Sequence, residues 1–253
     1  MSFLKVKNKL AQIKFVKDSL WTISAHIFVS IAGLVINTII GVKFHADGLG
    51  IFSQSLSFYL LFSLIANLGI QTSAQKHAAQ YSIESEKLKQ IYSCSLFSTG
   101  ISSILITTLI ILILNVFPQF FSSVDVVQFL KILCLAIPIF SINKSQNNFL
   151  AGLRIFRIYS CVRVMRWVLI LSGIVFISII NGELNNIAFL FVFSEIILFL
   201  FLVIKCNPYW TKPNWEWIRL HLSFGVKNIM AEFVSTLNTQ QGADGSGCRH
   251  HHP

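Results

Sequence analysis

Residues 185–204 read NNIAFLFVFSEIILFLFLVI, a run in which Glu195 is the only charged side chain. An α-helix needs about 20 residues to cross the roughly 30 Å of hydrocarbon in a bilayer, and this run reaches that length. Five more apolar runs lie upstream, at residues 20–44, 51–75, 91–117, 127–150 and 161–181. The sequence therefore predicts an all-α membrane protein, a polytopic bundle of six transmembrane helices over residues 20–205.

The lysines and arginines fall almost wholly on alternate loops. The N-terminal segment holds Lys5, Lys7, Lys9, Lys14 and Lys17, and the loop after the second run holds Lys76, Lys87 and Lys89. The region after the fourth run holds Lys144, Arg154, Arg157, Arg163 and Arg166, and the region after the sixth run holds Lys205, Lys212 and Arg219. Because such residues concentrate on the cytoplasmic side, we expect a cytoplasmic N-terminus in a bacterial inner membrane. The formal net charge of +10 then reflects topology and anionic lipid, and nucleic acid is not an expected partner.

The remaining segments differ in composition from the six runs. Residues 1–19 alternate lysines with apolar side chains, which favours an amphipathic lead-in on the cytoplasmic surface. Residues 206–217 hold three tryptophans and two prolines, typical of a linker at headgroup level. Residues 218–239 form a more polar, partial seventh helix. Residues 240–253 share nothing with what precedes them, and we interpret them as the tail of a frameshifted or truncated reading frame.

Polar side chains inside the bilayer mark the candidate site, because they are costly there. Asn37, Asn67 and Gln71 lie on polar faces of the first two helices, and Lys131 lies on such a face of the fourth. Such residues also serve helix–helix contacts, snorkelling and topology, so those roles remain open. The candidate substrate-binding residues are Asn37, Asn67, Gln71 and Lys227 as cavity-lining residues, and Lys131, Arg163 and Arg166 as cations that could contact a phosphate or diphosphate.

Glu195 lies near the middle of the sixth helix, where a carboxylate must be protonated, paired or hydrated. It is a candidate for coupling transport to a cation or proton, and the alternative is an ion pair with a basic residue of a neighbouring helix. The sequence has no glycine-rich nucleotide loop, HExxH or GxSxG, so we expect no enzyme. Its five cysteines lack CxxC spacing, so we expect no disulfide framework, no metal site and no cofactor.

Four short motifs occur in a distinctive order along the chain. They are Gly48-Leu49-Gly50-Ile51-Phe52, Asn67-Leu68-Gly69-Ile70, Gly152-Leu153-Arg154 and Leu222-Ser223-Phe224-Gly225. Over roughly residues 15–239, this order resembles the bacterial Wzx-type (O-antigen) flippases of polysaccharide biosynthesis. These belong to the superfamily that also holds multidrug and toxin extrusion transporters.

The resemblance implies about twelve to fourteen helices in two pseudo-symmetric halves around a central cavity. It implies the translocation of an undecaprenyl-diphosphate-linked oligosaccharide, an O-antigen (lipopolysaccharide) or capsule repeat unit. The partners would be that lipid, membrane lipids and polysaccharide assembly proteins. This chain matches the N-terminal half and the start of the second. Because alternating access needs both halves, we expect the chain as given to be inactive alone.

Three other interpretations remain open at this point. The first is a multidrug or solute cation antiporter of the same fold, which the intramembrane Glu195 favours. The second is a membrane-embedded polysaccharide polymerase or acyltransferase, although the short outer loops argue against the long loop that a polymerase of this kind usually carries. The third is a remnant of a disrupted gene that transports nothing.

Overall fold

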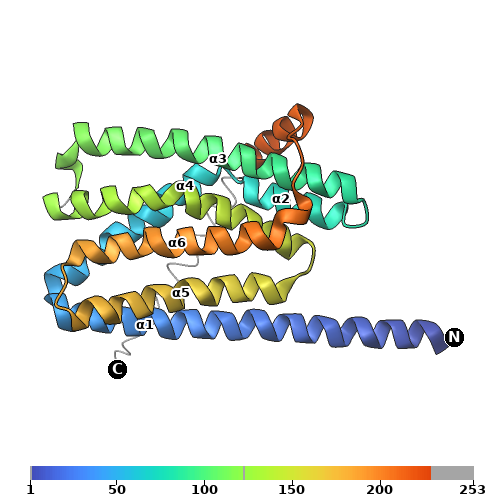
Figure 1. Ribbon diagram of the computed structural model, residues 1–253, viewed down its shortest axis with the longest axis horizontal. Helices are drawn as coiled ribbons and strands as arrows, with labels where there is room; N and C mark the ends of the chain where they lie inside the picture. The colour runs from blue at the N-terminus through green and yellow to red at the C-terminus, as the bar shows by residue number, and fades with distance from the viewer. Residues whose placement is uncertain (1, 122, 229–253) are drawn as a thin grey trace, which may run out of the picture.

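The computed structural model of the chain describes residues 2–121 and 123–228, with side chains described at residue 16 and from residue 18 onward. All the elements in these ranges are helical (Figure 1). They are α1 (Ser2–Asn67), α2 (Ile70–Gln80), α3 (Ser85–Val116), η1 (Pro118–Phe120), α4 (Val124–Gly152), α5 (Phe156–Ile179), α6 (Leu184–Cys206) and η2 (Asn207–Tyr209). Residues 215–228 form a further helical stretch. The predicted all-helical membrane fold is confirmed.

Helix α1 contains the first two predicted crossings. Its one non-helical residue is His45, with φ 60° and ψ −169°, and the limb after it runs back across the bundle (Figure 1). The separation of the runs 20–44 and 51–75 by a turn at residues 45–50, which their bounds imply, is therefore wrong, because Gly48 packs tightly on Phe44 and allows the second limb to begin at once. The lead-in 1–19 is helical from Ser2 and continuous with the first limb, and its placement on the cytoplasmic surface stays a prediction.

The second crossing ends earlier than the predicted residue 75. Leu68 and Gly69 both have positive φ, 47° and 68°, and this break separates α1 from α2. The expected connector at 76–90 is mostly helical: α2 continues to Gln80, and α3 begins at Ser85. We call residues 68–80, the break and α2 together, the elbow.

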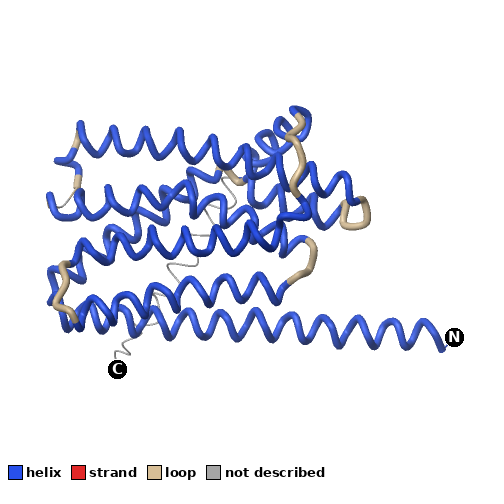
Figure 2. Tube along the Cα trace, viewed as in Figure 1, coloured by secondary structure: helices blue, strands red, loops and turns tan. Residues whose placement is uncertain are grey.

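The connecting segments gather at the two ends of the bundle (Figure 2). The turns at 81–84, 153–155 and 207–214 lie at the end from which α1 starts, and the segments at 117–121 and 180–183 lie at the other. The basic residues in or beside these three turns, among them Lys87, Arg154 and Lys212, thus share one end. We call it the basic end, and it is the end that we expect to face the cytoplasm.

Helix α4 forms the centre of the bundle, where it packs against α1, α2, α3, α5 and α6. Phe52 of α1 lies 6.3 Å from Phe129 of α4 and 6.2 Å from Phe191 of α6, measured between ring centroids. Such aromatic pairs contribute about 0.5–1.5 kcal/mol each beyond the area that they bury. Pro138 lies inside α4 without interrupting it.

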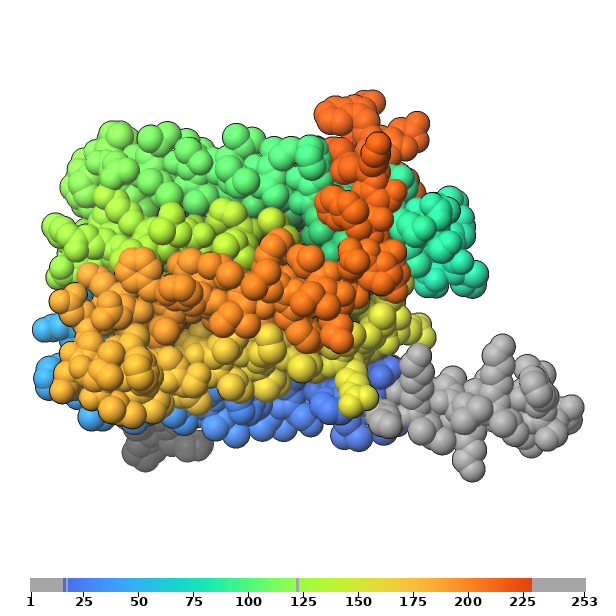
Figure 3. Space-filling view, in the orientation of Figure 1, coloured from blue at the N-terminus to red at the C-terminus, as the bar shows by residue number. Residues whose placement is uncertain are grey.

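Five helices of the described chain are long and apolar enough to cross a membrane, and the first of them holds the two limbs of α1. Large apolar side chains are exposed on their outer surfaces, among them Leu34, Leu105 and Ile204 at 69%, 65% and 73%. A water-facing surface would not carry so many, whereas lipid accepts them. Figure 3 shows α5 and α6 side by side on one face, with residues 207–228 standing across the basic end of α3.

Candidate functional site

A buried ion pair joins α5 to α6 in the middle of the bundle. Arg166 Nε donates to Glu195 Oε1 at 2.6 Å, and an Nη of Arg166 donates to Glu195 Oε2 at 3.0 Å. The Glu195 side chain is only 1% exposed. The guanidinium also lies 4.8 Å from the ring centroid of Phe140. Two parallel hydrogen bonds of this kind are the strongest arrangement available to an arginine and a carboxylate.

Asn143 of α4 completes the coordination of Glu195. Its Nδ2 donates to Glu195 Oε2 at 2.9 Å and to the main-chain oxygen of Glu195 at 2.8 Å. Helices α5 and α6 form an antiparallel hairpin, which brings residues 166 and 195 to the same depth. Both carboxylate oxygens therefore have charged or amide donors, which offsets the cost of burying the charge.

Buried hydroxyl groups without partners occur on α1 and α4, the helices that pack beside this hairpin. Tyr59 of α1 lies 5.5 Å from Phe140, the ring that supports Arg166. Among the described residues, the hydroxyls of Tyr59, Ser141 and Ser145 have no hydrogen-bond partner. The interior of this helical bundle thus holds polar groups with free hydrogen-bonding capacity, and the Tyr59 hydroxyl is one of them near the ion pair.

A second buried cluster holds residues 215–228 against the elbow. A Cβ on Gly69 would lie 2.6 Å from the carbonyl oxygen of Gly225, and a Cβ on Gly225 would overlap the carbonyl oxygen of Leu68. The two main chains are therefore in direct contact. Only glycine permits this approach, and Gly69 also supplies the positive φ that the break requires.

Two histidines lie beside this glycine contact and beyond the five membrane-spanning helices. His221 Nδ1 lies 2.8 Å from Ser73 Oγ, and the His77 ring lies 5.9 Å from both Trp217 and His221 between centroids. Burial lowers the pKa of His221 to about 3, and the nearby His77 acts in the same direction. Burial lowers the pKa of His77 as well, so both imidazoles are neutral at pH 7.

The model of one protein family, described as polysaccharide biosynthesis protein, matches residues 15–242. The chain belongs to this family. The match includes all the membrane-spanning helices, the buried ion pair and the elbow. No curated protein sequence is significantly similar to the chain.

Solved transporters share the fold of this polysaccharide biosynthesis protein. An outward-facing multidrug resistance MATE family transporter of the MOP superfamily superposes with a TM-score of 0.74 at 16% identity, over 88% of this chain and 53% of that one. A MOP superfamily transporter from Pyrococcus furiosus gives 0.68 at 17%, over 89% and 53%. A MATE transporter in the straight conformation gives 0.71 at 17%, over 88% and 54%. The chain spans about half the length of these transporters.

The structure distributes the predicted site residues of this polysaccharide biosynthesis protein over several places. Asn67 and Gln71 are buried inside the bundle, and the Asn67 amide donates to the main-chain oxygen of Ser63 at 3.2 Å. Asn37 is exposed on α1 and Lys227 on the 215–228 helix, while Lys131 is half-buried in α4. Only Arg166 and Glu195 meet. The cavity-lining and diphosphate-binding roles of the others stay predictions.

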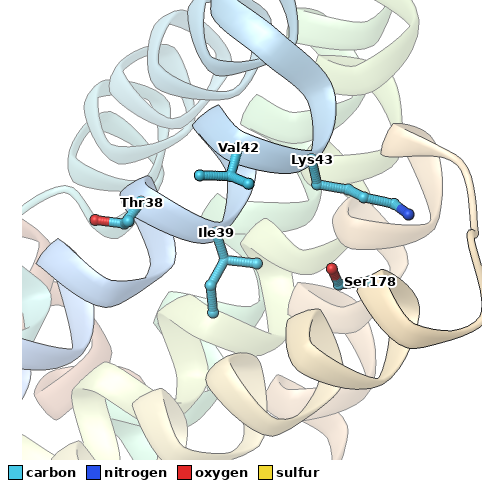
Figure 4. A pocket seen from close by; sticks show the side chains of 5 residues that line it. All are labelled: Thr38, Ile39, Val42, Lys43 and Ser178. Atoms are coloured by element: carbon cyan, nitrogen blue, oxygen red, sulfur yellow. The ribbon is translucent and has the colours of Figure 1, made fainter.

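The described residues also form an open pocket of about 320 Å³ between α1 and α5, near the end opposite to the basic end (Figure 4). Its lining is Thr38, Ile39, Val42, Lys43 and Ser178. Lys43 Nζ donates to Asn181 Oδ1 in the α5–α6 turn. The pocket holds one charged group, which is already engaged, and it lies far along the helices from the ion pair.

Asn143 is the residue of the buried network that the sequence analysis did not single out. Its signal was present, because an amide within the apolar run 127–150 must find partners inside the bundle. Arg166 and Glu195 were identified, but in separate roles. The sequence gives no rotation of α5 relative to α6, and that rotation decides which groups meet.

Proposed function

We propose that this chain forms the first lobe of a flippase that carries an undecaprenyl-diphosphate-linked oligosaccharide, such as an O-antigen or capsule repeat unit, across the bacterial inner membrane. The observation that carries the proposal is the family match over residues 15–242, whose description is polysaccharide biosynthesis protein. The half-bundle fold that it shares with MOP superfamily transporters supports a transport role. The lipid-linked sugar and membrane lipids are the proposed partners, together with polysaccharide assembly proteins.

The second lobe is part of the proposal. Transporters of this kind move substrate by rocking two halves around a site between them. Ser30 and Asn37 are exposed polar side chains of α1, and we expect a second lobe to enclose them. We therefore expect binding of the lipid-linked sugar by this chain, and transport only together with a second lobe.

An antiporter for organic cations is the competing function, since the structural neighbours include multidrug transporters. A cation site inside the membrane needs a carboxylate that is free to bind. Among the described residues, Glu195 is the only carboxylate at mid-helix depth, and its two oxygens are occupied by Arg166 and Asn143. This arrangement favours an anionic substrate over a cationic one.

The test is competitive photo-crosslinking with the purified chain in nanodiscs. A diazirine-bearing undecaprenyl-diphosphate oligosaccharide should label the chain, and the unlabelled lipid-linked sugar should abolish labelling. Tetraphenylphosphonium, an organic cation, should have no effect. Competition by the cation, with none by the lipid-linked sugar, would overturn the proposal and favour the antiporter.

A further inference from the structure

Two arginines near the basic end of α5 are oriented by aromatic rings. The Arg157 guanidinium lies 5.8 Å from the ring centroid of Trp21 on α1, and the Arg163 guanidinium lies 5.6 Å from that of Tyr159. Arg163 Nη1 also donates to the imidazole of His26 on α1. The two cations therefore lie along the seam where α1 and α5 pack together.

No carboxylate neutralises these two arginines within the described part of the chain. The three ion pairs there involve Lys87, Lys89 and Arg166. Asp18, one turn before Trp21, belongs to none of them. The imidazole of His26 accepts a hydrogen bond from Arg163 and so carries no charge to offset. Arg166, one turn beyond Arg163 on α5, differs: its charge is compensated by Glu195, whereas Arg157 and Arg163 have no ion-pair partner among the described residues.

We propose that Trp21, His26, Arg157, Tyr159 and Arg163 form a binding site for the phosphate group of a lipid. The planar guanidinium donates two parallel hydrogen bonds to phosphate oxygens, and its orientation on an aromatic ring reduces the entropy lost on binding. Tryptophan and tyrosine settle at headgroup depth, where such a phosphate lies. Trp21 is 42% exposed and Arg157 is exposed, so the seam is open to a ligand that enters from the bilayer.

The phosphate has two possible sources: an isoprenoid diphosphate or an ordinary anionic phospholipid. Both offer the same oxygens to the arginines, and the site does not depend on the proposed flippase function. Retention of basic residues on the cytoplasmic side is the plainer explanation for arginine here. That explanation predicts that neutralising any two basic residues at this end weakens binding of the phosphate probe equally. Basic residues elsewhere at this end therefore provide the control. Lys212 and Arg219 are exposed at the basic end and lie on other segments.

The experiment is native mass spectrometry of the purified full chain with three probes: farnesyl diphosphate, phosphatidylglycerol and phosphatidylcholine. The ligand is whichever of farnesyl diphosphate and phosphatidylglycerol binds the wild-type chain more tightly. We expect the variant R157Q/R163Q to lose at least tenfold in affinity for it. The charge-matched control K212Q/R219Q should stay within twofold of the wild type. Phosphatidylcholine should bind weakly to all three proteins.

A further pair of variants tests the geometry. H26A should weaken binding about threefold by releasing Arg163, and H26Q should restore it, because the glutamine oxygen also accepts from the guanidinium. A farnesyl diphosphate affinity tenfold above that of phosphatidylglycerol identifies a diphosphate ligand, and equal affinities identify a general anionic headgroup site. Equal losses in R157Q/R163Q and K212Q/R219Q, with matching elution in size-exclusion chromatography, would overturn the proposal.

Discussion

The buried carboxylate of Glu195 depends on Arg166, and the dependence is mutual. Each charge is acceptable at this depth only because the other is hydrogen-bonded to it. Removing one partner therefore costs much more than removing both, since the survivor remains buried and uncompensated.

We predict that E195Q lowers the free energy of unfolding by about 3–5 kcal/mol, because it leaves the Arg166 charge without a counter-ion. The double variant R166M/E195L removes both charges and should lose less than half of that. Thermal unfolding in detergent, followed by intrinsic tryptophan fluorescence, measures both effects. An E195Q protein as stable as the wild type would contradict this account of the ion pair.

At the scale of single residues, the sequence predicted which side chains would be important but not which side chains they contact. The cost of a carboxylate at mid-helix depth singled out Glu195, and an ion pair was one of its two expected explanations. Arg166 was expected to contact a diphosphate, as was Arg163, because both lie near the same helix end. Their environments differ through a rotation of about 300° around α5, three residues at about 100° each, which places only one of them opposite α6.

At the scale of elements, the contact between the elbow and the 215–228 helix is the most constrained. Ser93 Oγ accepts a hydrogen bond from the main-chain N–H of Thr211 at 2.8 Å, and Cys94 Sγ accepts one from the main-chain N–H of Asn214 at 3.1 Å. These bonds hold the linker to α3. At the glycine pair Gly69–Gly225, the main chain of the 215–228 helix is in direct contact with the main chain of the elbow.

We predict that G225A displaces the 215–228 helix, because the new methyl group would overlap the Leu68 carbonyl oxygen. That oxygen belongs to the main chain, which cannot move aside as a flexible side chain could. Hydrogen–deuterium exchange of peptides covering 215–228 should rise at least tenfold. G33A is the matched control: a Cβ there meets nothing within 4 Å, and alanine favours a helix over glycine by up to about 1 kcal/mol. Unchanged exchange in G225A would contradict the contact.

The same contact should weaken in acid. The pKa of His221 falls from 6.5 to about 3 when the helix is docked, so the undocked state binds the proton more readily. Docking is therefore strongest above pH 6.5 and declines by about 1.4 kcal/mol per pH unit as the pH falls from 6.5 toward 3. His77, whose pKa burial also lowers, acts in the same direction.

Hydrogen–deuterium exchange at pH 7.5 and pH 5.0, corrected for intrinsic exchange, measures this dependence. The excess exchange at pH 5.0 should shrink in H221N to the part contributed by His77. A wild-type protein whose 215–228 peptides exchange equally at both pH values would refute it.

Hydropathy predicted where the membrane helices lie because every run had to satisfy its main-chain hydrogen bonds within the bilayer. It did not predict the break at Leu68–Gly69. Leucine rarely adopts a positive φ, and here the packing of Gly69 against Gly225 imposes it from more than 150 residues away. A hydropathy pattern read over neighbouring residues cannot predict a contact between residues so far apart in the chain. The predictions for residues 229–239 and 240–253 concern segments outside the described residues.

At the scale of the whole molecule, the basic loops gather at one end, as the alternation of charge predicted. The motif order led to the correct family, because it follows the order of the helices and not any single site. The substrate-binding residues were less predictable, since a site between helices depends on their relative rotation and tilt.

We predict that the two ends face opposite compartments. In a cysteine-free background, F120C should react with a membrane-impermeant maleimide in intact cells, and I83C should react only after permeabilisation. Both positions are well exposed, at 79% and 96%, so accessibility differs only through topology. Labelling of I83C alone in intact cells would invert the orientation.

The kink at His45 has a mechanical consequence for the first hairpin. Where two membrane helices are joined by a loop of several residues, many torsion angles share any change in their mutual angle. Here only the φ and ψ of His45 depart from the helix, and they do so in a sparsely populated region. The two limbs of α1 thus form a stiff bent rod, and a tilt imposed on its first limb is delivered to Asn67 at the far end of the second.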